Sequence, residues 1–304
     1  MRAARSRLTL FLSVLVGACG GPRETSVPTV GASSQSVLHI PSPTDPVDVA
    51  EALKMHRGVR VVVRLSQCWK HAICARSAPL WAKSAMLEEF RLSAKEVRDL
   101  DGAYFQSAHY YVTRDAQILV AHHSPRERSQ QWVERTGHHW SLWREGETHD
   151  ADGAVMLFVL QPGWIAQGPR AAWIAGENAL RSHRLVLGEG PFMQAHFEKS
   201  SLSKRTPSDV SDAHVSMALI PDGGAELFVK LGVTNDAEVV AEKVRSILAD
   251  ENGFVLRVAT RDVLSGAKVT AEGDHVTISI PVSALQATSL LKLAGAYVGE
   301  DAEP

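Results

Sequence analysis

Apolar and polar residues alternate along much of the chain, and this alternation predicts strands. In the segment 59–65, for example, Val59, Val61, Val63 and Leu65 share one face of a predicted strand. Residues 155–160 are continuously apolar, which predicts a central strand that is covered on both faces. Predicted strands cover residues 59–65, 103–112, 117–122, 138–144, 154–160, 164–167, 215–219, 227–233, 254–259 and 276–282.

Apolar residues at helical spacing predict helices between these strands. Ser93 with Glu96 and Ser283 with Gln286 have the spacing of a capping box, in which two residues satisfy each other's backbone N–H groups at a helix start. The clearest amphipathic pattern lies in residues 237–247. Predicted helices cover residues 79–90, 124–137, 171–182, 237–247 and 283–298, with a short helix after Ser93.

This order of elements predicts an α+β fold, with antiparallel sheets and helices packed on one face. Each half of the chain has the order hairpin, helix, strand, hairpin, helix, and the helix-start residues Ser124 and Thr234 lie 110 positions apart. We therefore predict two repeated ββαβββα units, at residues 47–198 and 199–304. The alternative is chance recurrence, because hairpins and helices are common to α+β proteins. Two such units either share one sheet or form two lobes.

The N-terminus has the order of a secretory signal. Arg2, Arg5 and Arg7 form a basic leader, residues 8–16 are apolar, and small residues follow. The apolar stretch is far shorter than the roughly 20 residues that a membrane-spanning helix needs. We therefore predict that residues 1–18 are a cleaved signal peptide.

Residues 15–19 (LVGAC) resemble the lipobox of bacterial lipoproteins, with Val16 in place of the commonest residue, leucine. The resemblance implies cleavage before Cys19, a diacylglycerol thioether on its sulfur and an acyl chain on its new amino group. Two or more acyl chains anchor a protein stably to a lipid bilayer. Enteric lipoproteins of the inner membrane usually carry Asp after the cysteine, so Gly20 implies the outer membrane. The alternative is an ordinary secretory signal with an incidental cysteine.

Residues 19–46 are rich in Gly, Pro, Ser and Thr, a composition that buries too little apolar surface to fold by itself. We predict that this segment is a flexible tether between Cys19 and the folded part. A chain of this length spans about 30 Å root-mean-square.

Charge excludes one class of partner. The formal net charge is −2, and removal of the three leader arginines would make it −5. The sequence has no basic cluster interleaved with aromatic residues, so a nucleic-acid partner is not expected. No cofactor is predicted either.

Cys68 and Cys74 form a local pair with five residues between them. In an oxidising periplasm such a pair is expected to form a disulfide. The alternatives are a metal pair with His71 or two free thiols. Zinc sites usually have four ligands, and the chain has no second Cys/His pair with zinc-finger spacing.

Motifs for catalysis are absent from the sequence, including the nucleophile elbow, the phosphate loop and the zinc-protease motif. Histidines at 122–123, 138–139 and 149 are candidate metal ligands. Neighbours on a strand point to opposite faces, so each adjacent pair offers one histidine to a site. We therefore predict no metal site and interpret these as surface histidines. Core packing, rather than a ligand groove, is predicted for Trp132, Trp140, Trp143, Trp164 and Trp173.

Together these features predict a membrane-anchored envelope lipoprotein with a non-enzymatic binding or assembly role. The expected partners are the bilayer, through acylated Cys19, and an envelope protein or an apolar ligand. One alternative is a periplasmic lipid-carrying protein, which requires a deep apolar cavity. Another is an envelope hydrolase or metal-dependent enzyme that uses His122, His138 and His149.

Overall fold

The computed structural model describes the chain in segments between the first strand and the last helix. These segments are residues 46–49, 58–71, 73–74, 77–84, 93–107, 117–122, 155–161, 164–169, 184–202, 206–251 and 261–297. The signal peptide, nearly all of the tether, and the elements predicted at 124–137, 138–144, 171–182 and 254–259 lie outside them.

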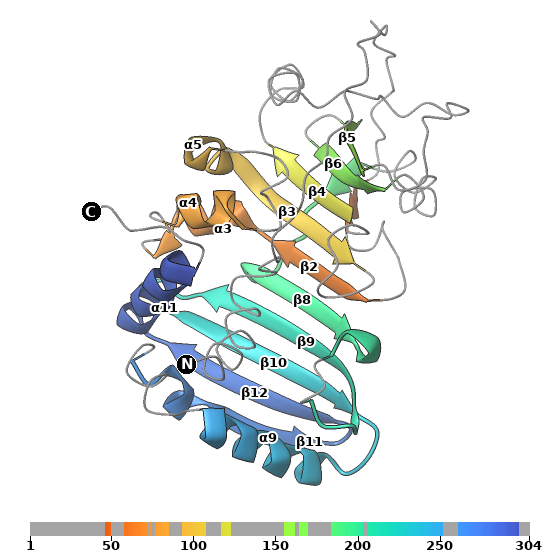
Figure 1. Cartoon of the computed structure of the whole chain (residues 1–304), viewed down its shortest axis with the longest axis vertical. Helices are drawn as coiled ribbons and strands as arrows, with labels where there is room; N and C mark the ends of the chain where they lie inside the picture. The colour runs from red at the N-terminus through yellow and green to blue at the C-terminus, as the bar shows by residue number, and fades with distance from the viewer. Residues whose placement is uncertain are drawn as a thin grey trace, which may run out of the picture.

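Within these segments, ten strands form one antiparallel sheet in the order β11-β12-β10-β9-β8-β2-β3-β4-β6-β5 (Figure 1). A separate parallel pair joins β1 (Pro46–Asp48) to β7 (Arg184–Val186). The strands of the large sheet are β2 (Val59–Val63), β3 (Leu100–Ser107), β4 (Gln117–His122), β5 (Val155–Gln161), β6 (Trp164–Pro169), β8 (Met193–Glu198), β9 (Val210–Leu219), β10 (Ala225–Val233), β11 (Lys268–Glu272) and β12 (His275–Val282).

The predicted α+β class is confirmed, and the helices pack on one face of the sheet. Buried apolar residues of α3, α5, α9 and α11 join those of the strands in a single core cluster. Figure 1 shows α9 running beside β11. The helices are α3 (Leu65–Trp69), α4 (Ala78–Ala82), α5 (Ala94–Val97), α9 (Ala237–Glu251) and α11 (Ala284–Tyr297), with the short 3₁₀ helices η4 (Lys199–Ser201) and η5 (Val263–Gly266).

The capping boxes predicted at Ser93 and Ser283 are present, and a third, predicted at Ser124 with Glu127, lies outside the described residues. The Ser93 hydroxyl accepts from the Glu96 backbone N–H, and the Glu96 carboxylate accepts from the Ser93 backbone N–H. Ser283 and Gln286 make the same reciprocal contacts at the start of α11. The sequence therefore located the start of both helices correctly.

The sheet has the same strand order on both sides of its central pair, β2 and β8. Outward from β2 come β3, β4, β6 and β5, and outward from β8 come β9, β10, β12 and β11. The registers also correspond. Phe105 pairs with Ile118 in the first half, and Val215 pairs with Val229 in the second half. Val215 follows Phe105 by 110 positions, and Val229 follows Ile118 by 111 positions. The pairs β4–β6 and β10–β12 correspond in the same manner.

This symmetry supports an internal repeat within one shared sheet. The predicted boundary after residue 198 falls between β8 and β9, which pair along their length. By strand order, β8 is the first strand of the second half. The helices that would complete the first unit lie outside the described residues.

Two local predictions were wrong. The strand predicted at 59–65 ends at Val63, because Leu65 begins helix α3. The helix predicted at 79–90 ends at Ala82, where a turn follows, and residues 85–90 lie outside the described part. Among the described strands, β5 pairs with β6 alone, and the strand predicted at 138–144 lies outside the described residues, so the central position predicted for residues 154–160 is not tested.

Residues around β1 and β7 cover the other face of the sheet over β2 and β3. Tyr104 and Val62 are buried there, and burial raises the pKa of Tyr104. The Trp164 indole donates to the Leu185 carbonyl at 3.0 Å and is 6% exposed. Core packing is thus confirmed for Trp164; the other four tryptophans of the prediction lie outside the described residues.

Candidate functional site

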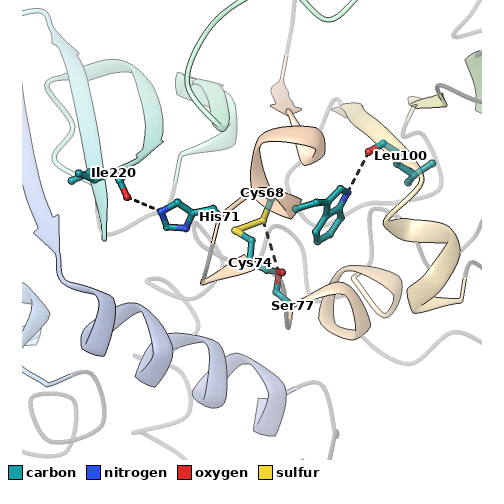
Figure 2. Close-up of a disulfide and its surroundings, with 7 residues drawn as sticks. Cys68, His71, Cys74, Ser77, Leu100 and Ile220 are labelled. Atoms are coloured by element: carbon teal, nitrogen blue, oxygen red, sulfur yellow. Dashed lines mark hydrogen bonds between the residues drawn. A yellow bond between two sulfur atoms is a disulfide. The ribbon is translucent and has the colours of Figure 1, made fainter. Parts of the chain in front are cut away.

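The structure brings the sulfur atoms of Cys68 and Cys74 together at bonding distance, as the predicted disulfide requires (Figure 2). Their Cα atoms are 5.0 Å apart, which lies within the usual range for a disulfide. His71 turns away from the sulfur atoms, and its Nε2 lies 2.7 Å from the Ile220 carbonyl oxygen. A carbonyl only accepts, so Nε2 carries the proton. This arrangement favours the disulfide over a metal pair with His71.

The disulfide loop connects the two halves of the sheet. His71 reaches the end of β9, while the Trp69 indole donates to the Leu100 carbonyl on β3 at 3.4 Å. Cys68 and Cys74 are 1% and 6% exposed. Reactive cysteines are usually partly exposed, so this burial indicates a structural disulfide.

The double variant Cys68→Ala/Cys74→Ala is expected to lose about 2 kcal/mol of unfolding free energy, because a short closed loop restricts the unfolded chain. Urea unfolding, with and without a reducing agent, measures the loss. Reductant should destabilise the unaltered protein by a similar amount and leave the double variant unchanged. Equal stability of both proteins under non-reducing conditions would contradict the disulfide.

The described residues do not bring the predicted histidine candidates together. His122 is the last residue of β4, where it pairs in register with Leu100 of β3. His123, His138, His139 and His149 lie outside the described residues. The hydrolase or metalloenzyme alternative built on them therefore stays untested.

The second half of the sheet presents an open polar face, opposite the helices. Cross-strand partners on this face alternate with the buried apolar partners, as a sheet with one solvated face requires. Phe228, 39% exposed, is a large apolar residue of this face. The polar residues that lie on this face of β8, β9, β10 and β12, by their pairing register, are Gln194, His196, Glu198, Asp212, His214, Ser216, Glu226, Lys230, His275, Thr277 and Ser279.

Two histidines are stacked on this face. His196 of β8 and His214 of β9 are register partners, and their ring centroids lie 4.3 Å apart with the planes tilted by 33°. Arg60 of β2 is the register partner of His196 on its other side, and its Nη2 lies 2.7 Å from His196 Nδ1. Asp212 precedes His214 by two residues, so its side chain lies on the same face.

The pKa of His196 follows from this setting. Burial lowers this pKa, and the adjacent His214 and Arg60 lower it further, against the opposing effect of Asp212 and Glu198. The net effect is a pKa below the ordinary value of histidine.

Sequence reasoning missed this cluster. The predicted alternation of Val215, Met217 and Leu219 already places Asp212 and His214 on the opposite, polar face. However, residues 193–198 were not predicted to form a strand, and the β8–β9 pairing that brings His196 to His214 is a tertiary contact.

Comparisons with known proteins name no family for this chain. No protein-family model matches it, and no curated protein matches it. Among solved structures, crystal form I of TP0453 is similar with a TM-score of 0.45 and 11% sequence identity, over 82% of this chain and 98% of that one. This likeness is too weak to support an argument about fold or function.

Proposed function

We propose that this protein is a bacterial envelope lipoprotein that is anchored through acylated Cys19 and has a non-enzymatic binding role. The observation that carries this proposal is the order of basic leader, short apolar core and lipobox-like residues 15–19. Gly20 extends the proposal to the outer membrane.

The folded domain fits this role in three respects. Its first described strand, β1, begins at Pro46, where the Gly/Pro/Ser-rich segment that we predict to be a tether ends. The Cys68–Cys74 pair suits an oxidising compartment. The open polar face over β8 to β12 leaves a broad surface for a partner. In the described part of the chain, no helix is long and apolar enough to cross a membrane.

The Cys19→Ser variant tests the anchor. Expressed in a bacterium with two membranes and fed a labelled fatty acid, the unaltered protein should carry the label and sediment with outer-membrane vesicles. Cys19→Ser should lose the label completely, because serine offers no thiol for the thioether. Cys68→Ala/Cys74→Ala is the matched control and should keep the label. A labelled Cys19→Ser protein, or an unlabelled soluble protein without substitution, would contradict the proposal.

Native mass spectrometry of the membrane-extracted protein tests the binding role. A reproducible added mass that is lost on denaturation would identify a bound ligand, and its size would separate a lipid from a metal ion. A lipid would favour the lipid-carrier alternative. Turnover of ester or peptide substrates, abolished by changing a histidine, would contradict the non-enzymatic role.

A further inference from the structure

Three side chains on the open face offer metal ligands at short range. His196, Asp212 and His214 each place one ligand atom within 4.8 Å of the others. Oδ2 of Asp212 lies 3.2 Å from Nε2 of His214 and 4.0 Å from Nε2 of His196. The side chains are 19%, 32% and 57% exposed for His196, Asp212 and His214, so an ion from solvent can reach them.

Neighbouring residues hold the Asp212 carboxylate in place. The Ser211 hydroxyl donates to Oδ1 at 2.7 Å, which leaves Oδ2 toward the two imidazoles. Gly232 of β10 lies against the same carboxylate, and a Cβ at this position would overlap both Oδ1 and the Ser211 hydroxyl. Hydrogen bonds of this kind orient metal-ligating carboxylates. The Asp212 carboxylate can therefore take this position only because residue 232 is glycine.

Arg60 acts against a cation at this position. A guanidinium only donates, so its contact with Nδ1 makes that nitrogen an acceptor and places the ring proton of His196 on Nε2. A metal on Nε2 requires the other tautomer, in which Nδ1 carries the proton. Arg60 must therefore release His196 when a metal binds. Lys230, the register partner of His214, adds a second positive group nearby, and Glu198 adds a negative one.

We propose that His196, His214 and Asp212 form a binding site for a divalent transition-metal ion, with coordination positions left open toward solvent. Imidazole and carboxylate together suit zinc, copper, iron and nickel rather than calcium. Three protein ligands with an open position are the arrangement of sites that also bind water or an external ligand. The metal site does not depend on the lipid anchor, so a negative result for either one leaves the other unaffected.

The test is titration of the purified full-length chain with Co²⁺ alone, followed by the d–d absorption bands of the bound ion. We expect saturable binding of one ion, and an affinity loss of about 100-fold or more for His196→Ala or His214→Ala. Gly232→Ala should weaken binding by about 10-fold, because it displaces the carboxylate. Arg60→Met should tighten binding, because it frees Nδ1 of His196.

His275→Ala is the matched control. His275 is the first residue of β12 and, like the proposed ligands, lies beside carboxylates. Its Nε2 is 3.8 Å from Glu272 and its Nδ1 is 3.2 Å from Asp274. This variant should bind Co²⁺ as the unaltered chain does. Circular dichroism and thermal unfolding verify that each variant is folded. Unchanged binding in folded His196→Ala and His214→Ala, equal loss in His275→Ala, or no saturable binding by the unaltered chain would overturn the proposal.

Discussion

The Arg64→Met variant is expected to lose about 3 kcal/mol of unfolding free energy, since it removes a buried charged donor that bonds to several partly buried oxygen atoms. Arg64 is 6% exposed and lies just after β2. Its Nε donates to the Gly188 carbonyl at 2.6 Å, and its Nη1 donates to the Pro191 carbonyl at 2.8 Å and to Gln194 Oε1 at 3.0 Å. Methionine has similar length but no donor.

These contacts fasten the segment that leads from β7 into β8. The same segment is held from its other side by Asp48, whose Oδ2 accepts from the Gly188 N–H at 2.7 Å. Burial lowers the pKa of Arg64, and the nearby Asp48 opposes that shift. Without the Arg64 side chain, this segment loses its bonds to the guanidinium and keeps those to Asp48 and to the Gln67 side chain.

Urea unfolding measures the Arg64→Met effect, with Arg245→Met as the matched control. Arg245 makes two ion pairs, with Glu238 at 2.8 Å and Glu242 at 3.0 Å, but its side chain is 39% exposed. Exposed ion pairs contribute less than about 1 kcal/mol. If Arg64→Met and Arg245→Met had equally small effects, the buried role of Arg64 would be refuted.

Ile280→Ala should also lose about 3 kcal/mol, because it leaves a cavity in the main core. Ile280 lies on β12, is 2% exposed and belongs to the cluster between the sheet and the helices. Its neighbour Ser279 points to the open face, where its hydroxyl donates to Glu226 at 3.0 Å. Ser279→Ala is therefore the control and should cost well under 1 kcal/mol. A cost for Ser279→Ala that matches that of Ile280→Ala would mean that the assigned faces are reversed.

Arg64 and Ile280 lie in different halves of one continuous sheet. Because β2 pairs directly with β8, the two halves are expected to unfold together. Each variant should shift one shared transition, as read by both tryptophan fluorescence and circular dichroism. Two separate transitions, each sensitive to one variant, would indicate two independent lobes.

Local sequence patterns predicted much of the second half of the fold. The hairpin of β9 and β10 turns at Asp222, where Gly223 has a positive φ of 94° and the Gly224 N–H bonds to the Asp222 carboxylate. The hairpin of β11 and β12 turns at Gly273, with φ of 58°. Such turns are encoded by neighbouring residues, and glycine adopts these angles without steric cost. Alternation, turn residues and caps therefore agree in this region.

Other features depend on contacts between distant segments. Strand β8 was missed, although Met193, Ala195 and Phe197 alternate with polar residues as a half-buried strand requires. Its pairing with β2 and β9 joins segments that are distant in the sequence. The stacking of His196 on His214 follows from that pairing. The short strand β1 is held by parallel pairing with β7, more than a hundred residues later in the chain. Local alternation can indicate a strand and its two faces, but it does not indicate which strands pair. The leader and Cys19, by contrast, are readable from residue order alone.

The mass of the mature N-terminus tests the central claim, lipid anchoring at Cys19, most directly. Trypsin digestion of protein extracted from membranes should release the peptide Cys19–Arg23. This peptide should carry a diacylglycerol group on the Cys19 sulfur, together with an acyl chain on its amino group. A mature chain that begins at another residue, or a peptide with a free Cys19 thiol, would contradict lipid anchoring at Cys19.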